Sequence, residues 1–338
     1  MDFQILGNSG LRVSELALGT MTFGNDWGWG APREECRKLF DAYAESGGNL
    51  IDTANTYTNG SSEEIVGQIL EGQRDQFVLA TKYTLTSRSD DPNASGSHRK
   101  NLVQSLEASL RRLRTDYIDL YWVHIWDPRT PTPELMRALD DQVRAGKVLH
   151  VGVSDSPAWV VARANTLAEW RDWSPFTAIQ AQYNLVERGA ERDLLPMARS
   201  LGMGALAWGP LAAGVLSGKY TSSSAASPPG VGRVDAASVP ERQLEIARAV
   251  QRVAGEVGFT PSQVALAWIR QQPGAVIPIV GARKLDQLHD NLACLGLTLD
   301  PSQLEILDRA SAIDLGFPHD FIVETQDLVY GTAGKLVR

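Results

Sequence analysis

Residues 49–70 read NLIDTANTYTNGSSEEIVGQIL, and this stretch carries the signals of one β-strand followed by one α-helix. The apolar run at 49–53 predicts the strand, which has Asp52 near its end. The helix is predicted to begin at Ser61, because Ser61 and Glu64 have the spacing of a capping box and precede an apolar pair four residues apart. The stretch therefore predicts a strand–loop–helix unit with a carboxylate where the strand ends.

The same alternation of an apolar run and a helix-like segment recurs along the chain. The runs are near-continuous rather than strictly alternating, as expected for parallel strands that are covered by helices. They lie at 15–20, 49–53, 77–82, 118–124, 148–154, 177–182, 204–208 and 275–282. Eight such units predict an α/β fold of the (β/α)8 TIM-barrel type, although a doubly wound sheet would generate six of the eight.

Three further features complete the predicted architecture. Residues 3–14 predict an N-terminal β-hairpin that turns around residues 8–10 and plugs the bottom of the barrel. Helix starts with a proline in the first turn are predicted at the following places: 132–133, 260–263 and 300–303. The stretch 221–240, rich in Ser, Pro, Gly and Ala, predicts a mobile loop after the seventh strand. No other linker divides the chain, so residues 1–338 are expected to form a single domain.

The composition excludes several classes of protein. The chain has 338 residues, of which 43% are hydrophobic, and a formal net charge of −8. An acidic chain lacks the basic surface that nucleic acids and anionic membranes require, so neither is expected as a partner. The two cysteines are too few for a disulfide framework or a metal cluster. With no signal peptide and no long apolar run, the chain is expected to be cytoplasmic; nothing in the sequence predicts its oligomeric state.

Polar residues gather where the predicted strands end. Asp52 lies at the end of the second strand, Lys82 at the end of the third and His124 at the end of the fourth. Active sites of such barrels lie at the carboxyl ends of the strands, so these side chains are expected to meet. Taken singly, His124 is more often a hydrogen-bonded core residue, and Asp52 with Lys82 is equally well a structural ion pair. Together at one mouth, they favour an active site over those readings.

The residue types narrow the chemistry to proton transfer. The histidines have no metal-binding spacing, and the chain has neither a GxSxG elbow nor a Walker loop. The stretch GMGALA at 202–207 precedes a strand, so it is no dinucleotide fingerprint. A lysine near Tyr57 is expected to lower the pKa of the phenol, and Asp52 to keep that lysine charged. A neutral His124 would orient a carbonyl oxygen beside the phenol, which suits a carbonyl that accepts a hydride.

Over residues 3 to 315 the chain resembles the aldo-keto reductases. The stretches that carry the resemblance are LGNSGLRVSELALGTMTFG, IDTANTY, LATK, DYIDLYWVH, RAGKVLHVGVSD, LAWGPLAAGVLSGKY and GARKLDQLHDNL. The resemblance implies a (β/α)8 barrel that binds NAD(P)H without a Rossmann fold. It is closest to bacterial members related to potassium-channel β subunits and aryl-alcohol dehydrogenases.

The resemblance also implies roles for residues. Tyr57 would be the general acid, Lys82 and Asp52 its tuning pair, and His124 the residue that orients the carbonyl. The cofactor residues would be Gly19, Thr20, Met21, Asp52, Ser154, Asp155, Gln180, Trp208, Gly209, Pro210, Leu211, Gly214, Leu216, Gly218, Lys219, Gly281, Arg283, Gln287 and Asn291. Arg283 is placed to bind a 2′-phosphate, so NADPH is expected to be preferred over NADH.

Three positions differ from the family's usual pattern. Asp155 stands where asparagine is usual, Gly209 where serine is common, and Trp208 where the stacking aromatic is usually tyrosine. The substrate wall is expected to be apolar, which would suit aryl or aliphatic aldehydes and ketones. Besides Tyr57 and His124, its candidate residues are Met21, Trp27, Trp29 and Trp126.

Three functions are consistent with these expectations. The first is NADPH-dependent reduction of a small-molecule carbonyl. The second is an aldolase in which Lys82 forms a Schiff base, a role that the Asp52 partnership disfavours. The third is a regulatory protein of the channel β-subunit type, which would bind cofactor, sense redox state and turn over slowly.

Overall fold

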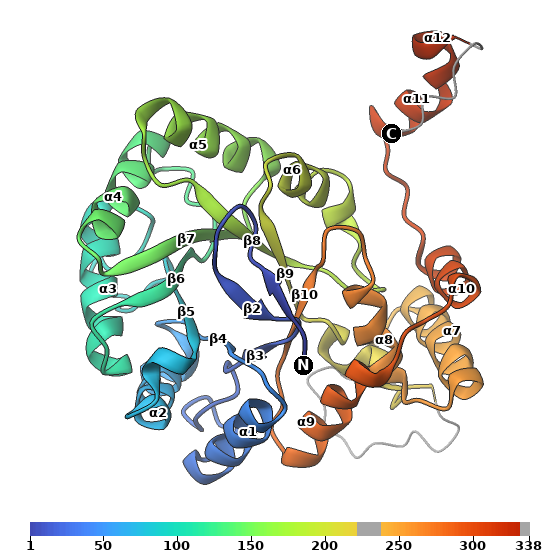
Figure 1. Ribbon diagram of the computed structural model, residues 1–338, viewed down its shortest axis with the longest axis horizontal. Helices are drawn as coiled ribbons and strands as arrows, with labels where there is room; N and C mark the ends of the chain where they lie inside the picture. Colours follow the sequence, from blue (N-terminus) through green and yellow to red (C-terminus); the bar gives the residue numbers. More distant parts are fainter. Residues whose placement is uncertain (222–237, 332–338) are drawn as a thin grey trace.

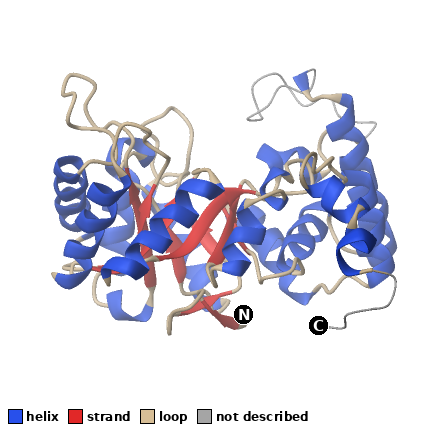
Figure 2. Ribbon diagram, turned by 90° about the horizontal axis from the view of Figure 1, so that it is seen from above, coloured by secondary structure: helices blue, strands red, loops and turns tan. Residues whose placement is uncertain are grey.

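Eight parallel strands form a closed barrel in the computed structural model, which describes residues 1–221 and 238–331. Their order around the barrel is β10-β3-β4-β5-β6-β7-β8-β9, and Figures 1 and 2 show helices around the outside. The strands are β3 (Ala17–Gly19), β4 (Leu50–Asp52), β5 (Val78–Tyr83), β6 (Ile118–Val123), β7 (Val148–Ser154), β8 (Phe176–Gln182), β9 (Gly204–Trp208) and β10 (Ile277–Val280). Each predicted apolar run yields one strand. The predicted TIM barrel is therefore confirmed, and the doubly wound alternative is wrong because the sheet closes on itself.

The N-terminal hairpin consists of β1 (Phe3–Ile5) and β2 (Arg12–Ser14), which pair antiparallel. Leu6 and Val13 are buried and pack in the same cluster as the side chains that fill the barrel. Gly7 has a φ of +54° and lies so close to the backbone of β8 and β9 that a side chain would clash with it. The hairpin thus closes the end of the barrel opposite the strand termini that carry the polar residues.

The helices cover the barrel from outside. They are α1 (Arg33–Glu45), α2 (Ser61–Leu70), α3 (Arg99–Leu113), α4 (Thr132–Arg144), α5 (Ala158–Arg171), α6 (Leu194–Ser200), α7 (Glu241–Val257), α8 (Pro261–Arg270), α9 (Leu285–Leu292) and α10 (Pro301–Ser311). Two short helices, α11 (His319–Glu324) and α12 (Gln326–Tyr330), lie on an extended segment that leads away from the barrel (Figure 1). Among the described residues, no helix combines the length and the apolar character that crossing a membrane requires.

The helix starts follow local chemistry, with one correction. The helix starts predicted at 260–263 and 300–303 are confirmed for α8 and α10, and capping boxes form there with Thr260 and Asp300 as N-caps. The capping box predicted at Ser61 is wrong. Gly60, at φ +98°, occupies the N-cap of α2, and Ser61 is already its first helical residue, so the Ser61 side chain cannot cap. Of the predicted mobile loop at 221–240, residues 222–237 lie outside the described part of the chain.

The alternation of side chains along each strand places the polar residues. Leu50 belongs to the cluster inside the barrel, whereas Ile51 belongs to the cluster between barrel and helices. Asp52 therefore faces inward again. The same alternation directs Ala80 and Lys82 of β5 inward. Because the strands are parallel and in register, these inward positions reach the same end of the barrel.

Candidate active site

Lys82 lies at the centre of the polar cluster. Its side chain is 0% exposed, and its ammonium contacts the Asp52 carboxylate. Lys82 Nζ also donates to the Thr53 carbonyl oxygen at 2.8 Å and to the Tyr57 hydroxyl at 3.1 Å. One ammonium thus joins the acid that ends β4 to the phenol in the following loop.

The loop after β4 turns Tyr57 back over the barrel mouth. Tyr57 begins a short 3-10 turn, η1 (Tyr57–Gly60), in which Thr58 and Asn59 have φ values of +45° and +55°. The Thr58 hydroxyl donates to the Phe23 carbonyl oxygen at 2.6 Å, which anchors the bend. The strained backbone of this turn is therefore held by its neighbours, and it fixes where the phenol lies.

Burial and charge leave the two nitrogen bases of the cluster, Lys82 and His124, in different protonation states. Burial is the largest single influence on Lys82 and lowers its pKa, but Asp52 and Tyr57 together outweigh burial, so the pKa of Lys82 is raised. Burial and then the Lys82 charge lower the pKa of His124 to about 3. The site therefore holds a charged ammonium and a neutral imidazole side by side.

The pKa of Tyr57 differs from the expectation drawn from sequence. Burial raises it above the usual value of a phenol, and the opposing effect of Lys82 is the smaller one. The sequence predicted that a lysine lies near Tyr57, but it did not predict how deeply the phenol is buried. Tyr57 is therefore protonated at neutral pH, as a proton donor must be.

His124 faces Tyr57 with an unpaired nitrogen. The two rings meet edge to face, with centroids 5.9 Å apart. His124 Nδ1 is buried and has no hydrogen-bond partner among the described residues. A buried polar atom without a partner is costly and calls for an explanation, and a ligand that contacts the imidazole is one.

Gln180 completes the surroundings of Asp52. Its side-chain amide donates from Nε2 to Asp52 Oδ1 at 3.0 Å, across the barrel from β8 to β4. Lys82 holds the other carboxylate oxygen. Both oxygens of Asp52 are therefore fixed by charged or amide donors, which accounts for a carboxylate that is only 2% exposed.

A cavity of about 1290 Å³ opens from these groups. Most residues that the resemblance assigns to the cofactor line it: Gly19, Met21, Asp52, Ser154, Asp155, Gln180, Trp208, Gly209, Pro210, Leu211, Gly214, Lys219, Gly281, Arg283, Gln287 and Asn291. Thr20, Leu216 and Gly218 do not. Thr20 and Leu216 are fully buried, and Gly218 lies against Pro261.

The expected substrate residues divide in the same way. Tyr57, His124 and Trp27 line the cavity, whereas Trp29 and Trp126 do not. Trp29 packs against Trp27, with ring centroids 5.5 Å apart. Trp126 packs edge to face against Trp159 of α5, at 5.8 Å. Two of the three tryptophans expected in the cavity wall, Trp29 and Trp126, are therefore absent from its lining and pack against another tryptophan instead.

The sequence reasoning missed one wall of the cavity, formed by Asn184, Val186 and Glu187 after β8. Asn184 shapes this wall, because its side-chain oxygen accepts from the backbone N–H groups of Val186 and Glu187 at 2.8 and 2.9 Å. An asparagine two residues beyond a predicted strand was the available signal. It was overlooked because the side chain acts on its own loop.

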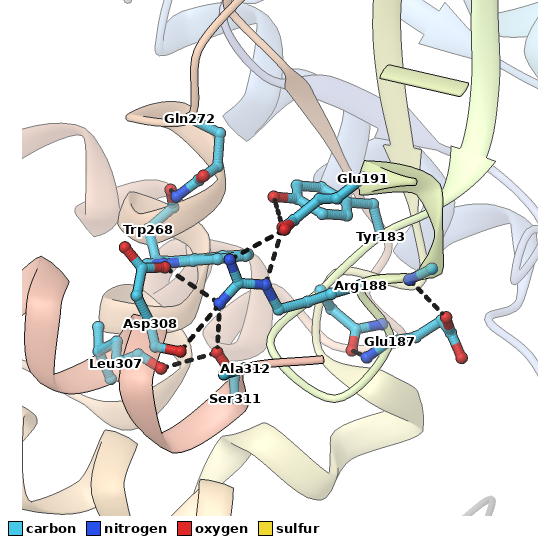
Figure 3. A network of polar contacts seen from close by, with 12 residues as sticks. Tyr183, Glu187, Arg188, Glu191, Trp268, Gln272, Leu307, Asp308, Ser311 and Ala312 are labelled. Atoms are coloured by element: carbon cyan, nitrogen blue, oxygen red, sulfur yellow. Dashed lines mark hydrogen bonds and ion pairs between the residues drawn. The ribbon is translucent and has the colours of Figure 1, made fainter. Parts of the chain in front are cut away.

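Arg188 joins this wall to helix α10 near the C-terminal end of the barrel. Figure 3 shows its guanidinium between Glu191 and Asp308, with ion-pair distances of 2.8 and 3.1 Å. The group also lies over the Trp268 ring and donates to the Ser311 hydroxyl at 2.8 Å. Helix α10, remote from the chemistry, thus holds the loop that borders the cavity.

Two of the positions that depart from the family pattern contact each other. Trp208 Nε1 donates to Asp155 Oδ1 at 2.9 Å. Tryptophan has an indole N–H that donates only, and a carboxylate accepts only, so the two replacements are complementary. The sequence showed both residues but not that they pair.

The far end of the cavity suits a phosphorylated ligand. Arg283 lies just before α9 and lines the cavity, and its guanidinium has no hydrogen-bond or ion-pair partner within residues 1–221 and 238–331. Lys219 lines the cavity beside the turn η4 (Ala212–Ser217), close to Gly214. Cationic groups at one end and the orphaned His124 nitrogen at the other fit an extended dinucleotide whose reactive ring lies beside Tyr57.

Comparisons with known proteins agree with this geometry. The model of the aldo/keto reductase family matches residues 15–312. A norsolorinic acid reductase of Aspergillus flavus is 39% identical over 97% of this chain and 86% of its own length. An aryl-alcohol dehydrogenase [NADP(+)] of Phanerodontia chrysosporium is 37% identical over 98% of this chain and 91% of its own.

These relatives are fungal. The expected likeness to aryl-alcohol dehydrogenases is matched by name, whereas the bacterial origin and the link to channel β subunits stay predictions. The family match covers most of the chain and the relatives cover nearly all of it. The chain belongs to the aldo/keto reductase family and is an oxidoreductase that acts on carbonyl and alcohol groups.

Proposed function

We propose that the protein reduces an aldehyde or ketone to the alcohol with NADPH, and that Tyr57 donates the proton. The observation that carries the proposal is the single ammonium of Lys82, which contacts both the Asp52 carboxylate and the Tyr57 hydroxyl. When bound, the nicotinamide of NADPH supplies a hydride to the carbonyl carbon. The carbonyl oxygen takes a proton from Tyr57, and the positive charge of Lys82 stabilises the phenolate that remains.

His124 has the protonation state that this role requires. With a pKa of about 3 it is neutral, so one ring nitrogen can donate a hydrogen bond to the carbonyl oxygen without adding a second cation beside Lys82. The imidazole would orient the oxygen toward the phenol. Gln180 and Lys82 together would hold the Asp52 carboxylate in place.

NADPH is proposed over NADH because of Arg283. Its guanidinium lines the cavity and is unpaired within the described residues, so it is available to a 2′-phosphate, whose oxygens match its fork of donors. The exposed Lys284 beside it adds a second positive charge. The relative named aryl-alcohol dehydrogenase [NADP(+)] is consistent with this choice.

The substrate is proposed to be an aryl aldehyde or ketone. Trp27, Leu85 and Met21 line the cavity and offer apolar and aromatic contacts near Tyr57. The names of the relatives, an aryl-alcohol dehydrogenase and a norsolorinic acid reductase, agree with this class. The aldolase reading is disfavoured, because Schiff-base formation needs a neutral amine and the pKa of Lys82 is raised by Asp52.

Tyr57→Phe tests the role of the phenol. We expect this variant to bind NADPH as the wild type does, measured by fluorescence titration, and to lose about 100-fold or more of its aldehyde reduction, the usual contribution of a general acid. Tyr117→Phe is the matched control, because Tyr117 contacts Arg74 on the outside of the barrel. Unchanged turnover in Tyr57→Phe would remove Tyr57 from the mechanism. Cofactor binding with negligible wild-type turnover of all aryl carbonyls would favour the regulatory reading instead.

Arg283→Ala tests the choice of cofactor. Loss of a charge-assisted contact should weaken NADPH binding by about 10-fold to 100-fold and leave NADH within about threefold. Arg309→Ala, at an exposed position on α10, is the control. Equal weakening of both cofactors would refute the assignment of Arg283 to the 2′-phosphate.

A further inference from the structure

Asp155 holds an uncommon position at the catalytic end of the cavity. It directly follows β7, and its φ of +39° lies in the left-handed region of backbone conformation that residues other than glycine rarely adopt. The Asp155 N–H donates to the Gln180 carbonyl oxygen, and the Asp155 carbonyl oxygen accepts from Trp126 N–H, both at 3.3 Å. Both neighbouring segments thus hold the backbone in this conformation, and the side chain faces the cavity.

The carboxylate is fixed by one donor only. Trp208 donates to Oδ1 at 2.9 Å, and Oδ2 has no hydrogen-bond partner in the part of the chain that the structure describes. No cation makes an ion pair with it there, in contrast to Asp52, which contacts Lys82. Burial raises the pKa of Asp155 above its usual value, and the Trp208 N–H and the charge of Lys82 offset this only in part.

The charges at this end of the cavity do not balance. Asp52 and Lys82 cancel one another, His124 is neutral, and Tyr57 is protonated. Asp155 therefore leaves the catalytic end with a net negative charge. Its influence reaches the reacting groups, because its charge acts on both Tyr57 and Lys82.

A net negative charge discriminates between the two redox forms of a nicotinamide. The oxidised ring carries a positive charge and the reduced ring is neutral, so a carboxylate nearby attracts only the oxidised form. The ring must lie beside Tyr57, since the carbon that accepts the hydride bears the oxygen that Tyr57 protonates. This step rests on the proposed function.

We propose that the Asp155 carboxylate, held by Trp208, determines cofactor redox preference by tightening the binding of NADP+ relative to NADPH. Bound alcohol and NADP+ are in equilibrium with bound carbonyl, NADPH and one released proton. Stabilising the oxidised cofactor shifts this equilibrium on the protein toward the alcohol and NADP+, which are the products of carbonyl reduction. One charge acting on another through partly hydrated protein changes an affinity by on the order of tenfold.

Asp155→Asn tests the proposal, because it removes the charge and retains an oxygen to accept from Trp208. The dissociation constants of NADP+ and NADPH are measured separately by titration of tryptophan fluorescence. We expect the ratio of the NADP+ to the NADPH constant to rise about tenfold, mainly through weaker NADP+ binding. Asp172→Asn is the matched control, because Asp172 also has a positive φ, +54°, and lies at the C-terminus of α5, on the outside of the barrel.

The outcomes separate this inference from the proposed function. An unchanged ratio, or equal weakening of both forms, would overturn the role of the Asp155 charge. If the wild type binds neither form, the proposed function itself fails, whatever Asp155→Asn does. If NAD+ and NADH bind instead, the same ratio measured with that pair still tests Asp155.

Discussion

Asp52→Asn would remove the charge that keeps Lys82 protonated and change little else in size. In the wild type the pKa of Lys82 is raised, because Asp52 and Tyr57 together outweigh the effect of burial, and Asp52 is the larger of the two. Without the carboxylate, burial becomes the dominant influence, and it favours the neutral amine. We therefore expect Lys82 to release its proton when the variant folds at pH 7.

The cost follows from the proton that folding must remove. An unfolded lysine has a pKa of about 10.4, and each pH unit below it costs about 1.4 kcal/mol if the folded group is neutral. The variant should lose about 4.6 kcal/mol of its free energy of unfolding at pH 7, within the range of about 3–5 kcal/mol for a broken buried ion pair. The loss should shrink to about 2 kcal/mol at pH 9, because releasing a proton costs less free energy as the pH approaches the pKa of the unfolded lysine.

The change of the free energy of unfolding with pH distinguishes the variant from the wild type. A raised folded pKa gives stability that is complete below about pH 10.4 and is lost only above it, so Lys82 adds no pH dependence to the wild type between pH 7 and 9. In Asp52→Asn the unfolded state binds one more proton than the folded state, so stability rises with pH. The gap between the two proteins should therefore close by about 2.7 kcal/mol from pH 7 to 9.

Urea unfolding at pH 7, 8 and 9, followed by the fluorescence of the 9 tryptophans, measures this gap. Asp119→Asn is the matched control, because Asp119 is also buried and contacts Arg74 at 2.6 Å. Arginine does not release its proton in this range, so the control should lose stability equally at every pH. A gap that stays constant for Asp52→Asn would refute the reasoning, since Lys82 would then remain protonated without its carboxylate.

Three further predictions concern other parts of the molecule. Because the pKa of His124 is about 3, its ring signals in NMR spectra should not titrate between pH 5 and 9, and a midpoint in that range would contradict the neutral imidazole. Arg188→Met should lower the free energy of unfolding by about 2 kcal/mol, since it removes charged hydrogen bonds that join α10 to the cavity wall; an unchanged urea midpoint would show that the network adds nothing. Thr260→Ala should cost about 1 kcal/mol through loss of the α8 N-cap, against less than about 0.5 kcal/mol for the exposed Thr166→Ala, and equal losses would contradict a capping role.

The barrel and the polar cluster at its mouth were predictable because both follow from local patterns. Apolar runs separated by helix signals placed every barrel strand, and the period of two along a strand directs Asp52 and Lys82 inward at the same end. The capping box predicted from Ser61 and Glu64 was wrong, because the N-cap position is occupied by Gly60 in a left-handed backbone conformation that serine does not favour. A helix start was thus predicted correctly, with the wrong residue as its cap.

The contacts that cross the barrel were not predictable. Gln180 and Asp52 are 128 residues apart, and Trp208 and Asp155 are 53 apart, so no spacing in the sequence indicates that they meet. The direction of the Tyr57 pKa was missed for a related reason. A sequence identifies the lysine that lowers it but not the depth of burial that raises it more.

Burial explains why one mouth can hold two nitrogen bases in different states. It acts in the same direction on both, since it disfavours the positive charge of Lys82 and of His124 alike. Lys82 contacts the Asp52 carboxylate and the Tyr57 hydroxyl, and the two contacts together reverse the outcome for Lys82. The Lys82 charge then helps to keep His124 neutral, because a second cation nearby would be repelled. The carboxylate of Asp52 therefore separates the two bases, because it favours the charged form of Lys82, whereas burial remains the largest influence on His124 and disfavours its charged form.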